Sequence, residues 1–258
     1  GNAVGFALAE KMLASAFNRD GFNVVDHYTY AFCGDGCLME GLSYEAASLA
    51  GSWKLGKLIV IYDKNDITIE GSINGVFDDD VGARFSSQGW QVIDAGDGED
   101  TEAFGAAVTL AKKDTEHPAL IIVHTRIGKG SGKEGSESCH GAPLGEQCLA
   151  DMKTAMGWKQ PPFTALPLTA GYTQEVRERG AKASAEWNKL MRAYKNAYPE
   201  LHAELTRRLK GKFPDLAHDE EFWAAAPKGD SATRNHSGAV LNWLADNRIP
   251  ELVGGSAD

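Results

Sequence analysis

Residues 28–50 read YTYAFCGDGCLMEGLSYEAASLA and contain, in order, a strand pattern, a glycine-rich turn and a helix pattern. The first part alternates aromatic residues with smaller ones, which is the period of a β-strand, and the last part places leucine and alanine at helical spacing. Gly34-Asp35-Gly36 therefore lies at the carboxyl end of a strand, just before a helix. Open α/β sheets bind ligands at this position, because the first N–H groups and the dipole of a helix favour an anion.

A second strand is predicted at 57–63, where residues 58–62 form an unbroken apolar run, and Asn65 follows it. A right-handed crossover between the two strands brings their carboxyl ends to the same edge of one parallel sheet. Asp35 and Asn65 are therefore expected side by side, and the two glycines let the backbone approach phosphate oxygens. Because Mg²⁺ binds hard oxygen ligands, the pattern predicts a Mg²⁺-diphosphate site. The alternative interpretation is an ordinary turn, in which a Gly-Asp-Gly by itself also occurs.

The rest of the sequence alternates helix and strand patterns. Helical spacing recurs at 2–18 and 101–113, and apolar strands are predicted at 90–94 and 118–125. This alternation predicts an α/β fold in which a parallel sheet carries helices on both faces. From 127 to 145 the chain is rich in glycine and poor in apolar residues, which is typical of a loop that wraps a ligand or of a mobile surface loop.

Composition excludes several classes of protein. The 258 residues, 43% of them hydrophobic, suffice for a large core and for more than one structural unit. A net charge of −10 argues against general nucleic-acid binding, because phosphate backbones require a basic face. No apolar run is long enough for a transmembrane helix. The four cysteines lack redox or zinc spacing, so we expect free thiols in a reducing compartment and a cytoplasmic protein.

Residues 33–41 (CGDGCLMEG), together with the strand that ends in Asn65, closely resemble the thiamine diphosphate fingerprint of the transketolase family. Residues 140–145 (HGAPLG) resemble a second block of that family, and 254–258 (GGSAD) a third, at the opening of its second module. Ala232-Thr233-Arg234 resembles the linker just before that module. The four blocks occur in family order and cover nearly the whole chain.

The resemblance also implies how the chain is divided. It places a diphosphate-binding module at 1–165, a charged helical linker at 166–247, and the start of a pyrimidine-binding module at 248–258. Family members carry further histidines ahead of the first helix and a catalytic glutamate in the second module, and neither is found here. We therefore expect an interior fragment of a longer enzyme, inactive when alone.

For the metal and the cofactor, the resemblance implies roles for individual residues. Mg²⁺, or Ca²⁺, would be held by Asp35, Asn65 and the backbone carbonyl of Ile67. The residues implied to contact thiamine diphosphate are Gly34, Gly36, Glu40, Ile69, Ile127, His140 and Asp258, the last from a partner subunit. On residue type alone, the two isoleucines would be core residues, and His140 a surface-loop histidine.

Further roles concern the reaction and a partner subunit. His140 would lie near the reacting substrate, and Arg234 would grip the substrate's phosphate. Glu40 and Glu45 would join a proton relay across a homodimer interface; taken alone, they read as solvated helix residues. Glu137 stands where many family members have a histidine, which leaves one cofactor or substrate contact in doubt.

The function that the resemblance implies is a transketolase of the pentose phosphate pathway. Such an enzyme moves a two-carbon ketol unit from a ketose phosphate to an aldose phosphate with thiamine diphosphate and Mg²⁺. Two alternatives stay open: a dihydroxyacetone synthase with a formaldehyde acceptor, and a non-catalytic module that binds diphosphate only to assemble with a partner.

Overall fold

The computed structural model describes residues 1–255, in two compact units that divide between Trp187 and Asn188. The first unit contains a four-stranded parallel sheet in the order β1 (Thr29–Gly34), β2 (Leu58–Lys64), β6 (Ala119–His124), β5 (Gln91–Asp97). The predicted α/β fold and parallel sheet are confirmed.

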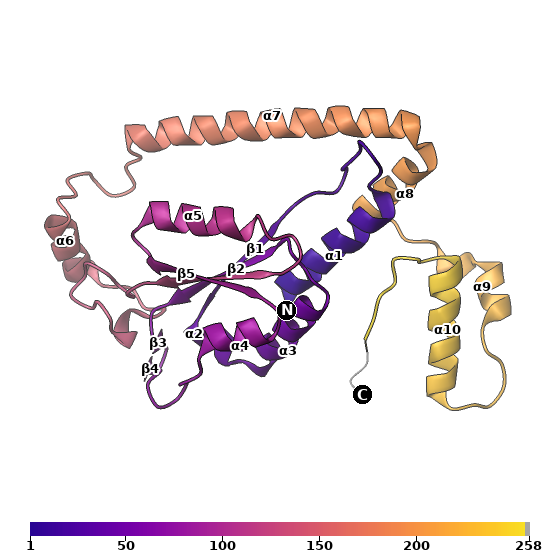
Figure 1. Cartoon of the computed structure of the whole chain (residues 1–258), viewed down its shortest axis with the longest axis horizontal. Coiled ribbons are helices and arrows are strands. Elements are labelled where there is room, and N and C mark those ends of the chain that lie inside the picture. Colours follow the sequence, from indigo (N-terminus) through magenta and orange to yellow (C-terminus); the bar gives the residue numbers. More distant parts are fainter. Residues whose placement is uncertain (256–258) are drawn as a thin grey trace. The chain divides into compact units, whose positions relative to one another are not determined.

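Helices cover both faces of this sheet (Figure 1). One face packs against α1 (Asn2–Phe17), α2 (Asp35–Met39), α3 (Gly41–Ser52) and α4 (Val81–Ser87), and the other against α5 (Thr101–Ala111). Side chains alternate between the two faces along β2: Leu58 and Tyr62 point to the first, Ile59 and Ile61 to the second. Each buried aliphatic side chain contributes roughly 1.5–3 kcal/mol to folding, so burial on both faces stabilises the sheet that carries the site.

The stretch 28–50 differs from its prediction in one respect. The single expected helix is two helices, α2 and α3, separated at Glu40, whose backbone is extended (φ −71°, ψ 131°). Asp35 is the first residue of α2, and Gly41 opens α3. The break turns the two short helices against each other while keeping Asp35 at the strand end.

Gly51, near the end of α3, shows why a small residue is needed there. A Cβ atom on Gly51 would lie 1.8 Å from the carbonyl oxygen of Gln88, so the helix and the turn after α4 meet backbone to backbone. This close approach fixes α3 against the first face of the sheet.

The segment after β2 forms a small hairpin that the sequence did not predict. Its strands are β3 (Ile67–Thr68) and β4 (Gly71–Ser72), paired antiparallel with Ile67 opposite Ser72. After β6, the glycine-rich segment contains one short 3₁₀ helix, η1 (Glu137–Cys139), and leads to α6 (Glu146–Ala155).

The remainder is helical, as predicted. Helix α7 (Pro167–Ala197) crosses the boundary between the units, and the second unit contains α8 (Pro199–Leu209), η2 (Leu216–His218), α9 (Glu220–Ala225) and α10 (Thr233–Asn247). The proposed module boundaries at 165 and 247 stay predictions. Within residues 1–255, none of the helices combines the length and the apolar character that a membrane span requires.

Candidate functional site

Asp35 is the centre of the site. It follows β1 directly and is only 1% exposed, so its carboxylate needs hydrogen-bond donors. Tyr62 Oη donates to Oδ1 at 2.5 Å, and the backbone N–H groups of Asn65 and Asp66 donate to Oδ2 at 3.1 and 2.9 Å. These three hydrogen bonds tie the end of β1 to the end of β2, and they bring Asp35 and Asn65 together as the crossover predicted.

Tyr62 is a site residue that sequence reasoning read only as part of an apolar strand. Burial, and then the hydrogen bond to Asp35, raises the pKa of the Tyr62 phenol, so it stays neutral and donates. A tyrosine at the end of an otherwise aliphatic strand was the one available signal. Burial likewise raises the pKa of the Cys33 thiol to about 12, so this thiol is protonated at neutral pH and is a poor nucleophile.

Asn65 is held by the turn that follows β2. Its Oδ1 accepts the N–H of Ile67 at 3.1 Å, and Asp66 adopts a left-handed backbone (φ 60°). This turn presents the Asn65 amide and the Ile67 backbone at the same edge of the sheet as Asp35.

The residues present fit a hard cation such as Mg²⁺. A carboxylate offers about four acceptor positions, and Asp35 uses three of them, so one remains free for a metal. Among residues 1–255, no group of three or more His, Cys, Asp or Glu side chains is arranged to hold a metal ion. A metal at Asp35 would therefore depend on amide and carbonyl oxygens beside this one carboxylate, a donor set that Mg²⁺ and Ca²⁺ accept.

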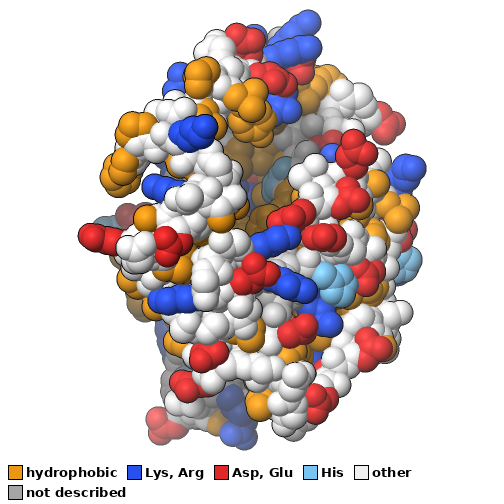
Figure 2. All heavy atoms as spheres, turned by 90° about the vertical axis from the view of Figure 1, so that its left-hand side faces the viewer, with side chains coloured by type: hydrophobic (Ala, Val, Ile, Leu, Met, Phe, Trp, Pro, Cys, Tyr) orange, Lys and Arg blue, Asp and Glu red, His pale blue; other side chains and the backbone are white. Residues whose placement is uncertain are grey.

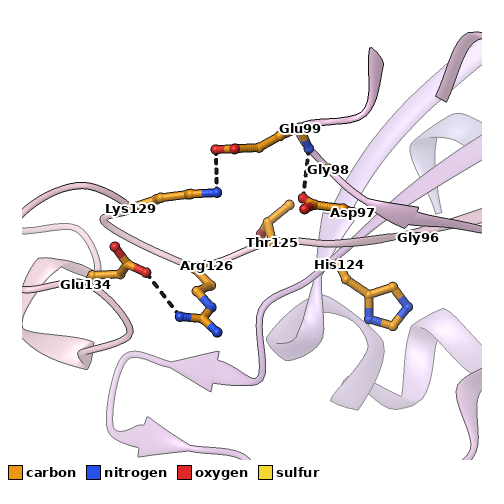
Figure 3. A pocket seen from close by; sticks show the side chains of 9 residues that line it. All are labelled: Gly96, Asp97, Gly98, Glu99, His124, Thr125, Arg126, Lys129 and Glu134. Atoms are coloured by element: carbon orange, nitrogen blue, oxygen red, sulfur yellow. Dashed lines mark hydrogen bonds and ion pairs between the residues drawn. The ribbon is translucent and has the colours of Figure 1, made fainter. Parts of the chain in front are cut away.

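A cavity of about 420 Å³, which we call the Asn65 cavity, opens beside these groups. Its lining residues are Asn65, Asp66, Ile67, Ser72, Thr125, Arg126, Glu134 and Gly135. A larger cavity of about 700 Å³ lies at the ends of β5 and β6 and shares Thr125, Arg126 and Glu134 with the first (Figure 3). The face that carries α6 is hollowed, and cationic and anionic side chains lie close together below the hollow (Figure 2).

The other predicted cofactor residues lie on separate parts of the first unit. Gly34 ends β1, and Gly36 lies on α2 in open space, so backbone there is accessible to a ligand. Ile127 is partly buried, and His140 is exposed directly after η1. Ile69 is 67% exposed in the turn between β3 and β4, so its interpretation as a core residue is wrong.

The residues assigned to substrate and partner contacts are all on the surface where the structure describes them. Glu40 and Glu45 are exposed at the start of α3. Arg234 is exposed on α10 of the second unit. Asp258 lies outside the described residues.

A family model described as "Transketolase, thiamine diphosphate binding domain" matches residues 1–214. The chain belongs to this transketolase family. It is 49% identical to the chromosomal transketolase of Cupriavidus necator and 46% identical to the transketolase of Geobacillus stearothermophilus, over 100% and 99% of its own length. It covers only 39% and 38% of those relatives' lengths.

Solved transketolase structures agree. The transketolase from Leishmania mexicana superimposes with a TM-score of 0.90 at 40% identity, over 100% of this chain and 38% of that one. A mutant transketolase from Pichia stipitis in complex with fructose 6-phosphate gives a TM-score of 0.89 at 43% identity, again over 100% and 38%.

Proposed function

We propose that this chain supplies the metal- and diphosphate-binding part of a transketolase that moves a two-carbon ketol unit between sugar phosphates. The observation that carries the proposal is the buried Asp35 carboxylate, clamped beside Asn65 by Tyr62 and two backbone N–H groups. Membership of the transketolase family, through its thiamine diphosphate-binding domain, supports the cofactor.

In this proposal the protein's part is to bind and orient the cofactor. Asp35, Asn65 and the Ile67 carbonyl hold Mg²⁺, while the backbone at Gly36 approaches the diphosphate. Thiamine diphosphate, when bound, supplies the carbanion chemistry that carries the ketol unit. Because Tyr62 stays protonated, its hydroxyl donates to Asp35 and fixes the orientation of that carboxylate, which preorganises the proposed metal site.

The remaining assignments are part of the same proposal. His140 and Ile127 contact the cofactor, and Arg234 binds the substrate's phosphate. Glu40 and Glu45 contact a second copy of the chain in a homodimer. His140, Arg234, Glu40 and Glu45 are exposed in the structure, which leaves them available for ligand or partner contacts, and Ile127 is partly buried. The proposed setting is the pentose phosphate pathway in the cytoplasm.

The test is ketol transfer from xylulose 5-phosphate by the protein that carries this chain, with ribose 5-phosphate and then formaldehyde as acceptor. Faster transfer to ribose 5-phosphate supports a transketolase. A preference for formaldehyde would reassign it as a dihydroxyacetone synthase, and binding of thiamine diphosphate without turnover under either condition would support a non-catalytic module.

A further inference from the structure

The glycine-rich segment after β6 is folded so that its backbone can hold an anion. Gly128, Gly130 and Gly135 have left-handed backbones (φ 64°, 76° and 73°), which side chains other than glycine rarely adopt. At Gly128 a Cβ atom would also lie 2.7 Å from Cys139 Sγ. The N–H of Gly135 donates to the Ile127 carbonyl at 2.8 Å and that of Ser131 to the Gly128 carbonyl at 3.0 Å, whereas the N–H of Gly130 donates to a side-chain anion.

That anion is a carboxylate of the chain itself. The Glu134 carboxylate accepts the Gly130 N–H at 2.9 Å through Oε2. Figure 3 shows its other partner, Arg126, whose Nη1 donates to Oε1 at 3.3 Å. The Gly130 N–H, and after it Arg126, lowers the pKa of Glu134, so the carboxylate is ionised at neutral pH. Lys129, the neighbouring cation, is instead paired with Glu99 at 2.6 Å.

Both partners face the candidate metal site. Arg126 and Glu134 line the Asn65 cavity together with Asn65 and Ile67, and among its lining residues Arg126 is the one cation. The other charged groups there, Asp66 and Glu134, are carboxylates that would repel a phosphate. A phosphate in this cavity would therefore bind most favourably if the Glu134 carboxylate released Arg126 and the Gly130 N–H.

The ion pair is easy to displace. The Arg126 side chain is 74% exposed and that of Glu134 31%, so water and salt screen their attraction. A phosphate carries more charge than a carboxylate and matches the planar guanidinium with two parallel hydrogen bonds. Exchange of the carboxylate for a phosphate is thus favoured once a ligand places one in the cavity.

We propose that Arg126 and the Gly130 N–H form a phosphate-binding site that Glu134 fills in this structure, and that a phosphate group bound beside Asn65 displaces Glu134. Its assignment to the cofactor's diphosphate rests on the proposed function. The other possible source of the same chemistry is the phosphate of a sugar substrate.

Isothermal titration of the protein with inorganic diphosphate, without Mg²⁺, tests the site itself. Glu134→Gln keeps an oxygen for the Gly130 N–H but removes the competing charge, so the Kd should fall, about fivefold. Arg126→Gln should raise the Kd about tenfold or more, because a hydrogen bond to a charged group is lost. In the double variant the gain from Glu134→Gln should disappear, since both changes act on one site.

Two variants control for general charge effects. Glu137→Gln removes an exposed carboxylate three residues along the same segment, and Lys129→Gln removes the neighbouring cation. Each should change the Kd less than twofold. An unchanged or raised Kd for Glu134→Gln, equal losses for Arg126→Gln and Lys129→Gln, or no diphosphate binding by any form would overturn the proposal.

The same variants titrated with thiamine diphosphate plus Mg²⁺, and separately with ribose 5-phosphate, identify the source of the phosphate. The natural ligand is the one whose Kd falls in Glu134→Gln and rises in Arg126→Gln. If thiamine diphosphate does not bind but inorganic diphosphate shows the pattern, the proposed function fails and the phosphate site stands.

Discussion

At the scale of single residues, the site depends on one buried carboxylate and the groups that hold it. The sequence predicted Asp35 only as a metal ligand at the end of a strand. Its burial and three hydrogen bonds also make it a structural link between two strands. Removing it would therefore disturb both the ion and the fold. Asp35→Asn is the better variant than Asp35→Ala, because the amide keeps an oxygen for the two backbone N–H groups.

Tyr62→Phe is expected to destabilise the protein. The phenylalanine removes the only O–H among the three donors to Asp35 and leaves a buried carboxylate oxygen short of a partner, at a cost of about 1–3 kcal/mol in the free energy of unfolding. Urea denaturation measures this cost. Tyr28→Phe is the matched control, since the Tyr28 hydroxyl bonds Lys112 O at 3.4 Å on the surface, and an equal loss in both variants would contradict the role given to Tyr62.

At the scale of elements, the contacts between backbones decide where the helices lie. Gly51→Ala would force a Cβ into the Gln88 carbonyl, so we expect a loss of about 1–3 kcal/mol or more in the free energy of unfolding. Gly105→Ala, on α5, is the matched control: its Cβ meets nothing within 4 Å, so it should stabilise by roughly 0.5–1 kcal/mol. Chemical denaturation measures both changes in the free energy of unfolding. If the two variants were both stabilised or both destabilised, the close packing of α3 would be refuted.

Helix α8 carries a pH-dependent interaction. The hydrogen bond from Arg207, with a further one from Arg208, lowers the pKa of Glu204 to about 2, below its unfolded value near 4.5. A lowered carboxyl pKa stabilises the fold above the unfolded pKa, and this stabilisation disappears as the pH falls through the folded pKa. Wild type should therefore be more stable than Glu204→Gln at pH 6, and the difference should shrink between pH 4.5 and 2. A difference that does not change across that range would contradict the assignment.

The sequence predicted the elements with a strong period and missed those without one. The strands β1 and β2, the crossover and the meeting of Asp35 with Asn65 follow from runs of apolar residues and a known handedness. The hairpin β3–β4 was missed because two-residue strands have no period to detect. The pairing of Arg126 with Glu134 depends on the conformation of a glycine-rich loop, which residue patterns do not specify.

At the scale of the whole molecule, the chain is a family member of partial length. The family match, residues 1–214, extends past the division between the two structural units at Trp187 and Asn188. The chain spans about 39% of the length of the curated relatives it matches, so the complete reaction, the substrates and the dimer remain proposals. What the first unit contains by itself is a hydrogen-bonded sheet edge with an oxygen-rich site and an adjoining cavity.

Titration of the protein with thiamine diphosphate, in the presence and absence of Mg²⁺, tests the central claim most directly. Wild type should bind tightly only with Mg²⁺, and Asp35→Asn should weaken that binding by more than about tenfold while remaining folded. Asp63 is the matched control, because its carboxylate lies at the same sheet edge but is not a proposed ligand of the metal. Asp63→Asn should bind thiamine diphosphate like wild type. Unchanged Mg²⁺-dependent affinity in Asp35→Asn would contradict the assignment of Asp35 as a metal ligand.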